Sequence, residues 1–350
     1  MTVIIPNQKK NILVLGGAGF IGSHLCEYLL HKGDNVICLD NFITSDVENI
    51  KMMLEFPNFE FIRHDITREI DFGKEPGLRK FKVHINGVRE IYNLACPTSA
   101  SDYTNLPIET ALANSLGTRI SLEMAKTYKA RYLFVSSSAV YGKTPEESNI
   151  IDENYLGKVN FIGPRACYNE GKRFSETLVS TYRDYFKLDT RITRLFTTYG
   201  PRMLKNSGRF IPDSIYAALN GQPIVIAGYA STGSSLCFVK DTVEGIVALM
   251  HSDMDQPVNF GNDSFYLYKD VAEKVLAIVG SGSEIQYSEG IPYTHQQAVP
   301  DITLAKEKLN WFPLVNLDDG LKQTIAYARS NYIDRPDIRR YGHDERAKSE

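Results

Sequence analysis

The sequence has no long hydrophobic run: no stretch approaches the roughly 20 consecutive apolar residues that a helix needs to span a bilayer. It also has no large excess of one charge, because 39 Lys and Arg residues against 42 Asp and Glu residues give a formal net charge of −3. Nucleic-acid binders usually depend on a strong positive field. The opening residues show no apolar core followed by a small-residue cleavage site, as a secretory signal would. We therefore predict a cytoplasmic protein that has neither a membrane nor a nucleic acid as a partner.

Cysteine and histidine are scarce and dispersed. The five cysteines form no CxxC pair, which is typical of reduced thiols in the cytosol. The seven histidines show no HxxxH spacing and no pairing with cysteine, so no metal site is predicted. For Cys96 and Cys167, packing is the favoured interpretation. No GxSxG motif supports a hydrolase.

The first half of the chain alternates short apolar runs with segments of helical periodicity. Strands that alternate with helices are typical of a parallel sheet covered on both faces, so we predict an α/β fold with a Rossmann-type doubly wound parallel sheet. The predicted strands are 11–15, 35–40, 59–63, 90–94, 131–135 and 190–195. The clearest predicted helices of this half are 20–31, 106–128 and 164–186.

The second half is more broken, and with 350 residues the chain exceeds the usual size of one hydrophobic core. Glycines and prolines punctuate the segment after residue 195, and helical spacing returns at 240–250, 268–279 and 318–330. We predict three parts: a dinucleotide-binding domain with the catalytic helix over 1–195, a smaller C-terminal α/β substrate lobe over 196–333, and a flexible charged tail over 334–350.

One connection is longer than usual. Residues 70–87 separate two predicted strands with glycines, a proline and several basic residues. A surface excursion is the favoured interpretation, and a loop with a functional role is the alternative.

A glycine cluster lies directly after the first predicted strand and opens the first predicted helix. Gly16, Gly19 and Gly22 have the spacing GxxGxxG. Glycines there allow a tight turn, a close approach of the backbone to a pyrophosphate, and close packing of helix on strand. The helix N-terminus from Phe20 offers free N–H groups and a positive dipole end to phosphates. This context predicts a dinucleotide site.

An acidic residue ends the second predicted strand, where it can accept hydrogen bonds from the adenosine ribose. Because this carboxylate, Asp40, would repel a 2′-phosphate and Asn41-Phe42 supplies no cation, we predict NAD rather than NADP. Asp65, after the third strand, is a weaker candidate for the adenine edge. The predicted cofactor-binding residues are Gly16, Gly19, Phe20, Ile21, Gly22, Asp40, Asn41, Asp65, Ile66, Leu94, Ala95, Tyr168 and Lys172.

A tyrosine and a lysine four residues apart indicate proton transfer. Tyr168 and Lys172 lie on one face of a predicted helix, and an ammonium group beside a phenol lowers the pKa of the phenol. The tyrosinate can then take a proton from a substrate alcohol as hydride leaves. Ser137 follows a predicted strand, whose carboxyl end faces the ligand crevice of a parallel sheet. The predicted catalytic residues are therefore Ser137, Tyr168 and Lys172.

These motifs together resemble the extended short-chain dehydrogenase/reductase superfamily, which contains nucleotide-sugar epimerases, dehydratases and decarboxylases. More narrowly, the chain is similar to UDP-glucuronate decarboxylases from about residue 10 to residue 330. The resemblance implies a Rossmann domain with a small substrate lobe, a homodimer, and transient oxidation of the sugar at C4 by tightly held NAD. It is carried by GGAGFIG (16–22), NLACPTSASDY (93–103), SSSAVYG (136–142), FIGPRACYNEGKR (161–173), YGPRMLKNSGR (199–209) and PDITLAKEKLNWFP (300–313).

The chain also departs from the decarboxylase pattern. The acid/base glutamate before VYG is Ala139, and the asparagine of FNxxGPR is Thr197. Two arginines of the family, one of which holds the substrate phosphates, fall on Ser234 and Val299. Losing a charge-assisted phosphate contact costs roughly 1.5–3 kcal/mol. The predicted substrate-binding residues are Ser138, Thr197, Arg202, Lys205 and Arg209, the last three as replacement cations.

The sequence thus predicts an NAD-dependent enzyme that oxidises a nucleotide-linked sugar at C4. Without the glutamate, proton movement at C5 is harder, which favours a 4-epimerase or 4-dehydrogenase outcome. A UDP-glucuronate decarboxylase is the first alternative, because a 4-keto uronic acid can lose carbon dioxide with little help. A catalytically degenerate NAD-binding protein is the second.

Overall fold

The computed structural model describes residues 9–145, 148–205, 207–289 and 298–331. The chain divides into two compact units. Unit 1 comprises Met1–Cys96, Leu112–Val135 and Phe174–Arg191, and unit 2 comprises Pro97–Ala111, Ser136–Arg173 and Ile192–Glu350. The predicted tail, 334–350, lies outside the described residues, and the predicted domain boundary at residue 195 stays a prediction.

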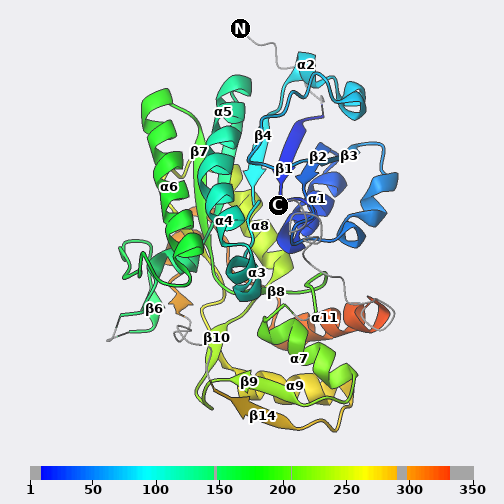
Figure 1. Cartoon of the computed structure of the whole chain (residues 1–350), viewed down its shortest axis with the longest axis vertical. Coiled ribbons are helices and arrows are strands. Elements are labelled where there is room, and N and C mark those ends of the chain that lie inside the picture. Colours follow the sequence, from blue (N-terminus) through cyan, green and yellow to red (C-terminus); the bar gives the residue numbers. More distant parts are fainter. Residues whose placement is uncertain (1–8, 146–147, 206, 290–297, 332–350) are drawn as a thin grey trace, which may run out of the picture. The chain divides into compact units, whose positions relative to one another are not determined.

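The main sheet has seven strands in the order β12-β7-β5-β4-β1-β2-β3 (Figure 1). Strand β1 pairs in parallel with β2 on one side and with β4 on the other, and the pairs β2–β3, β4–β5 and β7–β12 are parallel as well. This is the predicted Rossmann-type parallel sheet. Its strands are β1 (Asn11–Leu15), β2 (Asn35–Asp40), β3 (Phe59–Arg63), β4 (Glu90–Asn93), β5 (Arg131–Ser137), β7 (Thr190–Leu195) and β12 (Val258–Phe260).

The strands are strongly apolar because both faces of a parallel sheet are covered. Every residue of β1 is buried, and so are the last five of β2. The six predicted strands are confirmed to within two residues, and β12 was not predicted as a strand. Helices α1 (Phe20–His31), α5 (Thr118–Tyr128) and α6 (Ala166–Phe186) are also where the sequence placed them.

The predicted helix 106–128 is interrupted. It consists of α4 (Pro107–Leu112), a π-helical turn at Ala113–Gly117, and α5. Single π-helical turns inside α-helices are frequent at functional sites. Periodicity alone did not show this turn, because the apolar spacing continues through it.

Residues 70–87 are a packed excursion rather than an open loop. They contain a 3-10 helix, Pro76–Phe81, and the short helix α2 (Val83–Asn86). Leu78 and Phe81 are buried, and the Asn11 side chain donates hydrogen bonds to the carbonyls of Phe81 and Gly87. Because Asn11 is the first residue of β1, the excursion covers the edge of the sheet where the strands begin.

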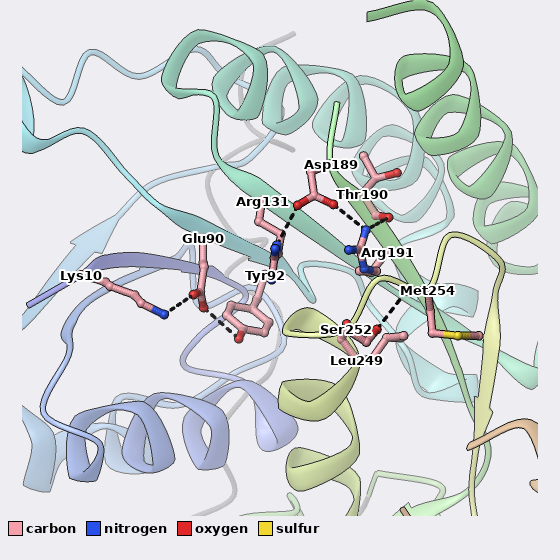
Figure 2. Close-up of polar contacts among 10 residues, drawn as sticks. All are labelled: Lys10, Glu90, Tyr92, Arg131, Asp189, Thr190, Arg191, Leu249, Ser252 and Met254. Atoms are coloured by element: carbon pink, nitrogen blue, oxygen red, sulfur yellow. Dashed lines mark hydrogen bonds and ion pairs between the residues drawn. The ribbon is translucent and has the colours of Figure 1, made fainter. Parts of the chain in front are cut away.

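Ion pairs join the starts of neighbouring strands at this edge (Figure 2). Lys10 contacts Glu90 at 2.9 Å, and the Tyr92 hydroxyl donates to the same carboxylate. Asp189 accepts from Arg131 at 2.7 Å and from Arg191 at 2.6 Å. The amino-terminal ends of β1, β4, β5 and β7 are therefore tied together by charge as well as by backbone.

Unit 2 contains the smaller elements. Helices α7 and α9 pack on each other, and the two-stranded sheet of β9 and β14 covers them (Figure 1). The three helices predicted after residue 195 are α8, α9 and α11 of the structure. The helices of this unit are α3 (Ala100–Asn105), α7 (Phe210–Leu219), α8 (Val239–Met250), α9 (Tyr268–Val279), α10 (Thr303–Leu309) and α11 (Leu317–Asn331). Its short strands are β6 (Ile150–Ile151), β8 (Thr198–Tyr199), β9 (Ile224–Ala227), β10 (Gly233–Ser235), β11 (Cys237–Phe238), β13 (Phe265–Leu267), β14 (Ile285–Ser288) and β15 (Val299–Pro300).

Candidate active site

The glycine loop in unit 1 is fixed by steric limits. The Gly16 N–H donates to the Leu39 carbonyl at 2.8 Å with φ at +75°, a left-handed conformation that favours glycine. A Cβ on Gly22 would lie 2.1 Å from the Gly16 carbonyl oxygen, so only glycine lets α1 approach the loop. At Gly19 the nearest atom would be 3.2 Å away, also the Gly16 carbonyl oxygen. The predicted roles in the turn and the close packing fit this geometry.

The N-terminus of α1 has the properties of an anion site. Its N-cap is Gly19, no side chain caps it, and the first turn carries no acidic residue. Phe20 and Ile21 therefore present backbone N–H groups at the positive end of a helix dipole. A pyrophosphate fits this position, and Asp40 lies near it for an adjoining ribose.

Asp40 also supports the loop itself. Its Oδ2 accepts from the Ala18 N–H at 3.1 Å, and its Oδ1 accepts from the Phe42 N–H and the Ser45 hydroxyl. Burial raises the pKa of this carboxyl, and the three donors oppose that shift. Asp40 thus connects the end of β2 to the glycine loop whether or not a ribose is present.

The other predicted cofactor residues of unit 1 follow the ends of β1, β2, β3 and β4. Burial raises the pKa of Asp65, but hydrogen bonds from Thr67 and Asn41 outweigh it and the net shift is downward. Ile66 is buried against the π-helical turn, where a Cβ on Gly117 would lie 2.9 Å from it. The Leu94 N–H donates to the Leu15 carbonyl, and a Cβ on Gly16 would lie 2.8 Å from Ala95.

Asn114 is a further candidate site residue of unit 1, and the sequence alone did not predict it. It lies in the π-helical turn of unit 1, its side-chain amide donates to the Cys96 thiol at 3.0 Å, and its backbone carbonyl accepts from the Ser175 hydroxyl. Cys96 follows β4 and is half-buried. The only signal in the sequence would have been an asparagine in an otherwise apolar stretch of helix.

In unit 2, Ser137 ends β5 and begins a tight turn. Its hydroxyl accepts from the Ala139 N–H at 3.2 Å, and a 3-10 helix runs over Ser138–Tyr141. The methyl group of Ala139 has no proton to transfer. Ser137 is half-buried, as a residue that contacts a ligand should be.

Tyr168 and Lys172 lie one turn apart on α6. Both are buried, at 7% and 3% exposure, and the Lys172 ammonium lies 6.0 Å from the centre of the Tyr168 ring. A buried lysine near a phenol is compatible with the predicted chemistry, and the catalytic roles stay a prediction.

Tyr103 extends this group and was not predicted as a site residue. Its ring stacks on Tyr168 with 5.3 Å between centroids, and the Arg165 guanidinium lies 5.6 Å from the Tyr103 ring. Burial raises the pKa of the Tyr103 hydroxyl, while the charges of Arg165 and Arg209 oppose the shift. The half-buried Cys167 thiol donates to the Tyr103 carbonyl at 3.7 Å.

In unit 2, neutral residues occupy two positions at which the resemblance led us to expect arginine. Ser234 is fully buried and donates to the Thr197 hydroxyl at 2.9 Å. Val299 is buried in β15, where it pairs with Ile150 of β6.

The predicted replacement cations have different surroundings. Arg209 donates a hydrogen bond to the Thr98 hydroxyl at 2.6 Å, and its positive charge opposes the rise in the pKa of Tyr103. Lys205 lies 4.9 Å from the Tyr216 ring, and Arg202 has a left-handed backbone with φ at +68°. Of the three, Arg209 is the one that the structure brings to the group around Tyr168.

Two other kinds of site find no support in the described parts of the chain. Across residues 9–145, 148–205, 207–289 and 298–331, no three His, Cys, Asp or Glu side chains are grouped so as to hold a metal ion. None of the helices built from these residues combines the length and the apolar character needed to cross a bilayer.

Similarity to known proteins shows the family of this chain. Residues 12–261 match the NAD dependent epimerase/dehydratase family, and the chain belongs to this family of NAD-dependent nucleotide-sugar enzymes. It is 39% identical over 337 residues to UDP-glucuronic acid decarboxylase 1 of Xenopus tropicalis, covering 94% of this chain and 76% of the relative. It is 40% identical over 315 residues to UDP-glucuronic acid decarboxylase 5 of Arabidopsis thaliana, covering 90% and 88%.

Solved structures with the same fold are named as epimerases rather than as decarboxylases. UDP-glucuronic acid 4-epimerase from Bacillus cereus, in complex with UDP-glucuronic acid and NAD, aligns with a TM-score of 0.78 at 26% identity, covering 91% of this chain and 99% of that one. UDP-glucose 4-epimerase from Thermotoga maritima, with UDP-glucose, aligns with a TM-score of 0.80 at 26% identity, covering 92% and 99%. The fold class and NAD as cofactor are confirmed.

Proposed function

We propose that this protein oxidises the C4 hydroxyl of a nucleotide-linked sugar and that the outcome is 4-epimerisation or 4-dehydrogenation. The observation that carries the proposal is the buried pair of Tyr168 and Lys172 on α6, one turn apart and on the same helix face. Two solved structures with this fold are named as 4-epimerases, and these names support C4 as the reacting carbon.

Each residue of the proposed catalytic group has a separate task. Tyr168, as phenolate, takes the proton of the C4 hydroxyl. The Lys172 ammonium stabilises that phenolate, since an opposite charge nearby favours the ionised form. Ser137 donates or accepts a hydrogen bond at the same hydroxyl and orients it for proton transfer. When bound, NAD accepts the hydride from C4 and can return it.

Ala139 favours the proposed outcome over chemistry at C5. A side chain next to the sugar that can exchange protons is needed to move a proton at C5, and a methyl group cannot do so. The 4-keto sugar is therefore expected to be reduced again or released without chemistry at C5.

Decarboxylation of UDP-glucuronate is the second candidate function. Two relatives that match at 39% and 40% identity are named as UDP-glucuronic acid decarboxylases. A β-keto acid loses carbon dioxide with little assistance, so this outcome does not strictly need the missing glutamate. The neutral Ser234 and Val299 argue against it, because an acidic sugar nucleotide is held best by charged donors.

Product analysis separates these outcomes. The purified protein is denatured to identify the cofactor that it releases, and is then incubated with UDP-glucose and with UDP-glucuronic acid. The proposal expects released NAD and a product that differs at C4 with all carbons retained. Release of carbon dioxide from UDP-glucuronic acid would establish the decarboxylase instead. Released NAD with no product from any sugar nucleotide would favour the degenerate NAD-binding protein.

We also propose a homodimer formed through the helices of unit 1. Leu112 and Leu116 are four residues apart and 43% and 36% exposed, and Phe174 on α6 is 49% exposed. Hydrogen bonds from Thr118 to Ser175 and from Tyr182 to Glu123 hold α5 and α6 together. Light scattering should give twice the chain mass, and the double substitution Leu112→Glu/Leu116→Glu should give a monomer. The cytoplasmic location stays a prediction.

A further inference from the structure

The orientation of Ser137 depends on the backbone turn that follows it in unit 2, residues 137–142, which we call the Ser137 turn. Ser137 is the N-cap of the 3-10 helix Ser138–Tyr141, and its hydroxyl accepts a hydrogen bond from the Ala139 N–H. The Gly142 N–H donates to the Ala139 carbonyl at 3.2 Å and closes the turn. Because the Ser137 hydroxyl is bonded to this backbone, a movement of the turn changes its direction.

Residues 156–158 lie directly against the Ser137 turn. The Lys158 N–H donates to the Tyr141 carbonyl at 2.9 Å. Gly157 has φ at +85°, and a Cβ on it would lie 2.8 Å from the carbonyl oxygens of Val140 and Tyr141. This close approach favours glycine, and it holds the two stretches of backbone together.

The Arg173 guanidinium joins both stretches to α6. Its Nη1 donates to the Val140 carbonyl at 3.0 Å and to the Leu156 carbonyl at 2.9 Å. Its Nε lies 3.5 Å from the carboxylate of Glu170, three residues earlier on the same helix. Arg173 directly follows Lys172, so the helix that carries the proposed catalytic lysine also holds the Ser137 turn.

This arrangement connects the two sides of the proposed catalytic group. Tyr168 and Lys172 lie on α6, whereas Ser137 ends β5, and all three have to meet at one hydroxyl of the substrate. Hydrogen bonds from a charged donor are stronger than those between neutral groups, and Arg173 makes two of them to backbone carbonyls. A displacement of a catalytic group by about 1 Å can lower a rate by about 100-fold.

We propose that Arg173 is a positioning residue that keeps the Ser137 hydroxyl at the distance from Tyr168 that proton transfer at C4 needs. This inference rests on the proposed function, since it assigns Arg173 to the same reaction. Because the Arg173 Nη1 is bonded to backbone carbonyls, Arg173 acts through the Ser137 turn and takes no part in proton or hydride transfer.

Steady-state kinetics with a matched control variant tests this proposal. Arg173→Ala is compared with Arg183→Ala, which makes the same change on the same helix, where the guanidinium pairs with Asp184. Alanine is the best helix former, so neither change weakens α6 through its helix propensity. Each variant is assayed as the NAD-loaded full chain, with the sugar nucleotide that the parent protein converts.

Arg173→Ala should lower kcat about 100-fold and change KM less than about threefold, because the alignment of Ser137 is lost and the affinity for substrate is kept. Arg173→Lys should recover at least about tenfold, since an ammonium group can still donate to one of the two carbonyls. Guanidinium ion, at concentrations well below those that unfold proteins, should raise the turnover of Arg173→Ala and not that of Arg183→Ala. The acid limb of the pH profile should keep its position, because Lys172 remains beside Tyr168.

Hydrogen exchange of the same proteins gives a readout that needs no turnover. The N–H groups of Gly142, Lys143 and Lys158 close the contact between the two stretches of backbone. In Arg173→Ala they should exchange at least about tenfold faster than in the parent protein, and in Arg183→Ala at the parent rate. A parent protein that converts no sugar nucleotide would refute the proposed function, whereas unchanged exchange in Arg173→Ala would refute the role of Arg173.

Three kinetic results would also overturn the role of Arg173. One is an equal loss of turnover in Arg173→Ala and Arg183→Ala, and another is a change in KM with kcat unchanged. The third is a shift of the acid limb of the pH profile in Arg173→Ala, which would make Arg173 an electrostatic partner of Tyr168 instead.

Discussion

The cofactor loop of unit 1 and the substrate positions of unit 2 are built in different ways. The cofactor loop depends on backbone and on the absence of side chains, since Gly16 and Gly22 face atoms that leave no room for a Cβ. The proposed substrate positions depend on the chemical groups of side chains, and the resemblance implies charged residues in the decarboxylases where this chain has Ala139, Ser234 and Val299. Ser234 and Val299 are nevertheless well packed and buried.

This difference indicates which of the two regions can change its ligand specificity. A loop defined by steric limits cannot accept a side chain at Gly16 or Gly22 unless the backbone shifts. A pocket defined by side chains can exchange a guanidinium for a hydroxyl if the hydroxyl finds a partner, as Ser234 does in Thr197. We therefore expect the cofactor to be shared with the family and the substrate to be where this chain differs.

The largest effect is expected at Tyr168. Tyr168→Phe removes the proposed proton acceptor and should lower turnover about 1,000-fold, the middle of the range for general acid–base catalysis. Steady-state kinetics measures the loss, and NAD content should be unchanged. Tyr229→Phe, at a tyrosine of unit 2 that is 82% exposed, serves as the control. Unchanged turnover in Tyr168→Phe would remove Tyr168 from the site.

The next largest effect is expected for NAD affinity, when a side chain is added to the cofactor loop at Gly22. In Gly22→Ala the added methyl group would lie 2.1 Å from the Gly16 carbonyl oxygen, so the loop must shift and NAD affinity should fall about 100-fold. Isothermal titration measures the affinity. The matched control is Gly282→Ala, whose methyl group meets no atom within 4 Å. Equal affinities in the two variants would contradict a loop fixed by steric limits.

A smaller effect is expected when the substrate side is made more like the decarboxylases. Ala139→Glu introduces a carboxyl next to Ser137, and solvent deuterium at C5 of the product should rise about tenfold over the parent because the carboxyl can exchange a proton there. Mass spectrometry of the product in deuterated water measures it. Ala139→Gln, which has a similar shape without an exchangeable acid, is the control. Substantial deuterium at C5 in the parent protein would mean that another group already moves that proton.

The smallest effect concerns the stability of unit 2. Hydrogen bonds from the Thr303 hydroxyl and N–H lower the pKa of Asp301. A carboxyl whose folded-state pKa is depressed contributes stability above its unfolded pKa, near 4, and loses it as the pH falls through the folded value. Asp301→Asn should cost about 0.5 kcal/mol at pH 7, because the group is largely solvated, and nothing near pH 2. Urea unfolding at the two pH values measures this difference, and a cost that is independent of pH would contradict the assignment.

Much of the fold could be predicted because periodicity and glycine placement are local signals. The segments 11–15 (NILVL) and 35–40 (NVICLD) are largely apolar, 59–63 (FEFIR) has three apolar residues out of five, and β1, β2 and β3 have those bounds. The π-helical turn at Ala113–Gly117 was missed because its apolar spacing does not differ from that of a regular helix. Residues 70–87 gave no clear pattern, because their buried side chains pack on distant parts of the sheet edge.

Residues of the candidate site could be predicted where a sequence motif contains them, but not where only tertiary contacts bring them together. Tyr168 and Lys172 are four residues apart, so one helix places them together. Tyr103 is 65 positions earlier in the sequence, and only the fold stacks its ring on Tyr168.

The central claim, oxidation at C4 assisted by Tyr168, is tested most directly by a single-turnover experiment. The NAD-loaded protein is mixed rapidly with UDP-glucose or UDP-glucuronic acid, and the absorbance of reduced nicotinamide is followed in the parent protein and in Tyr168→Phe. We predict a rise in absorbance with at least one substrate in the parent protein and none in the variant. Product formation at equal rates in both proteins would contradict the account.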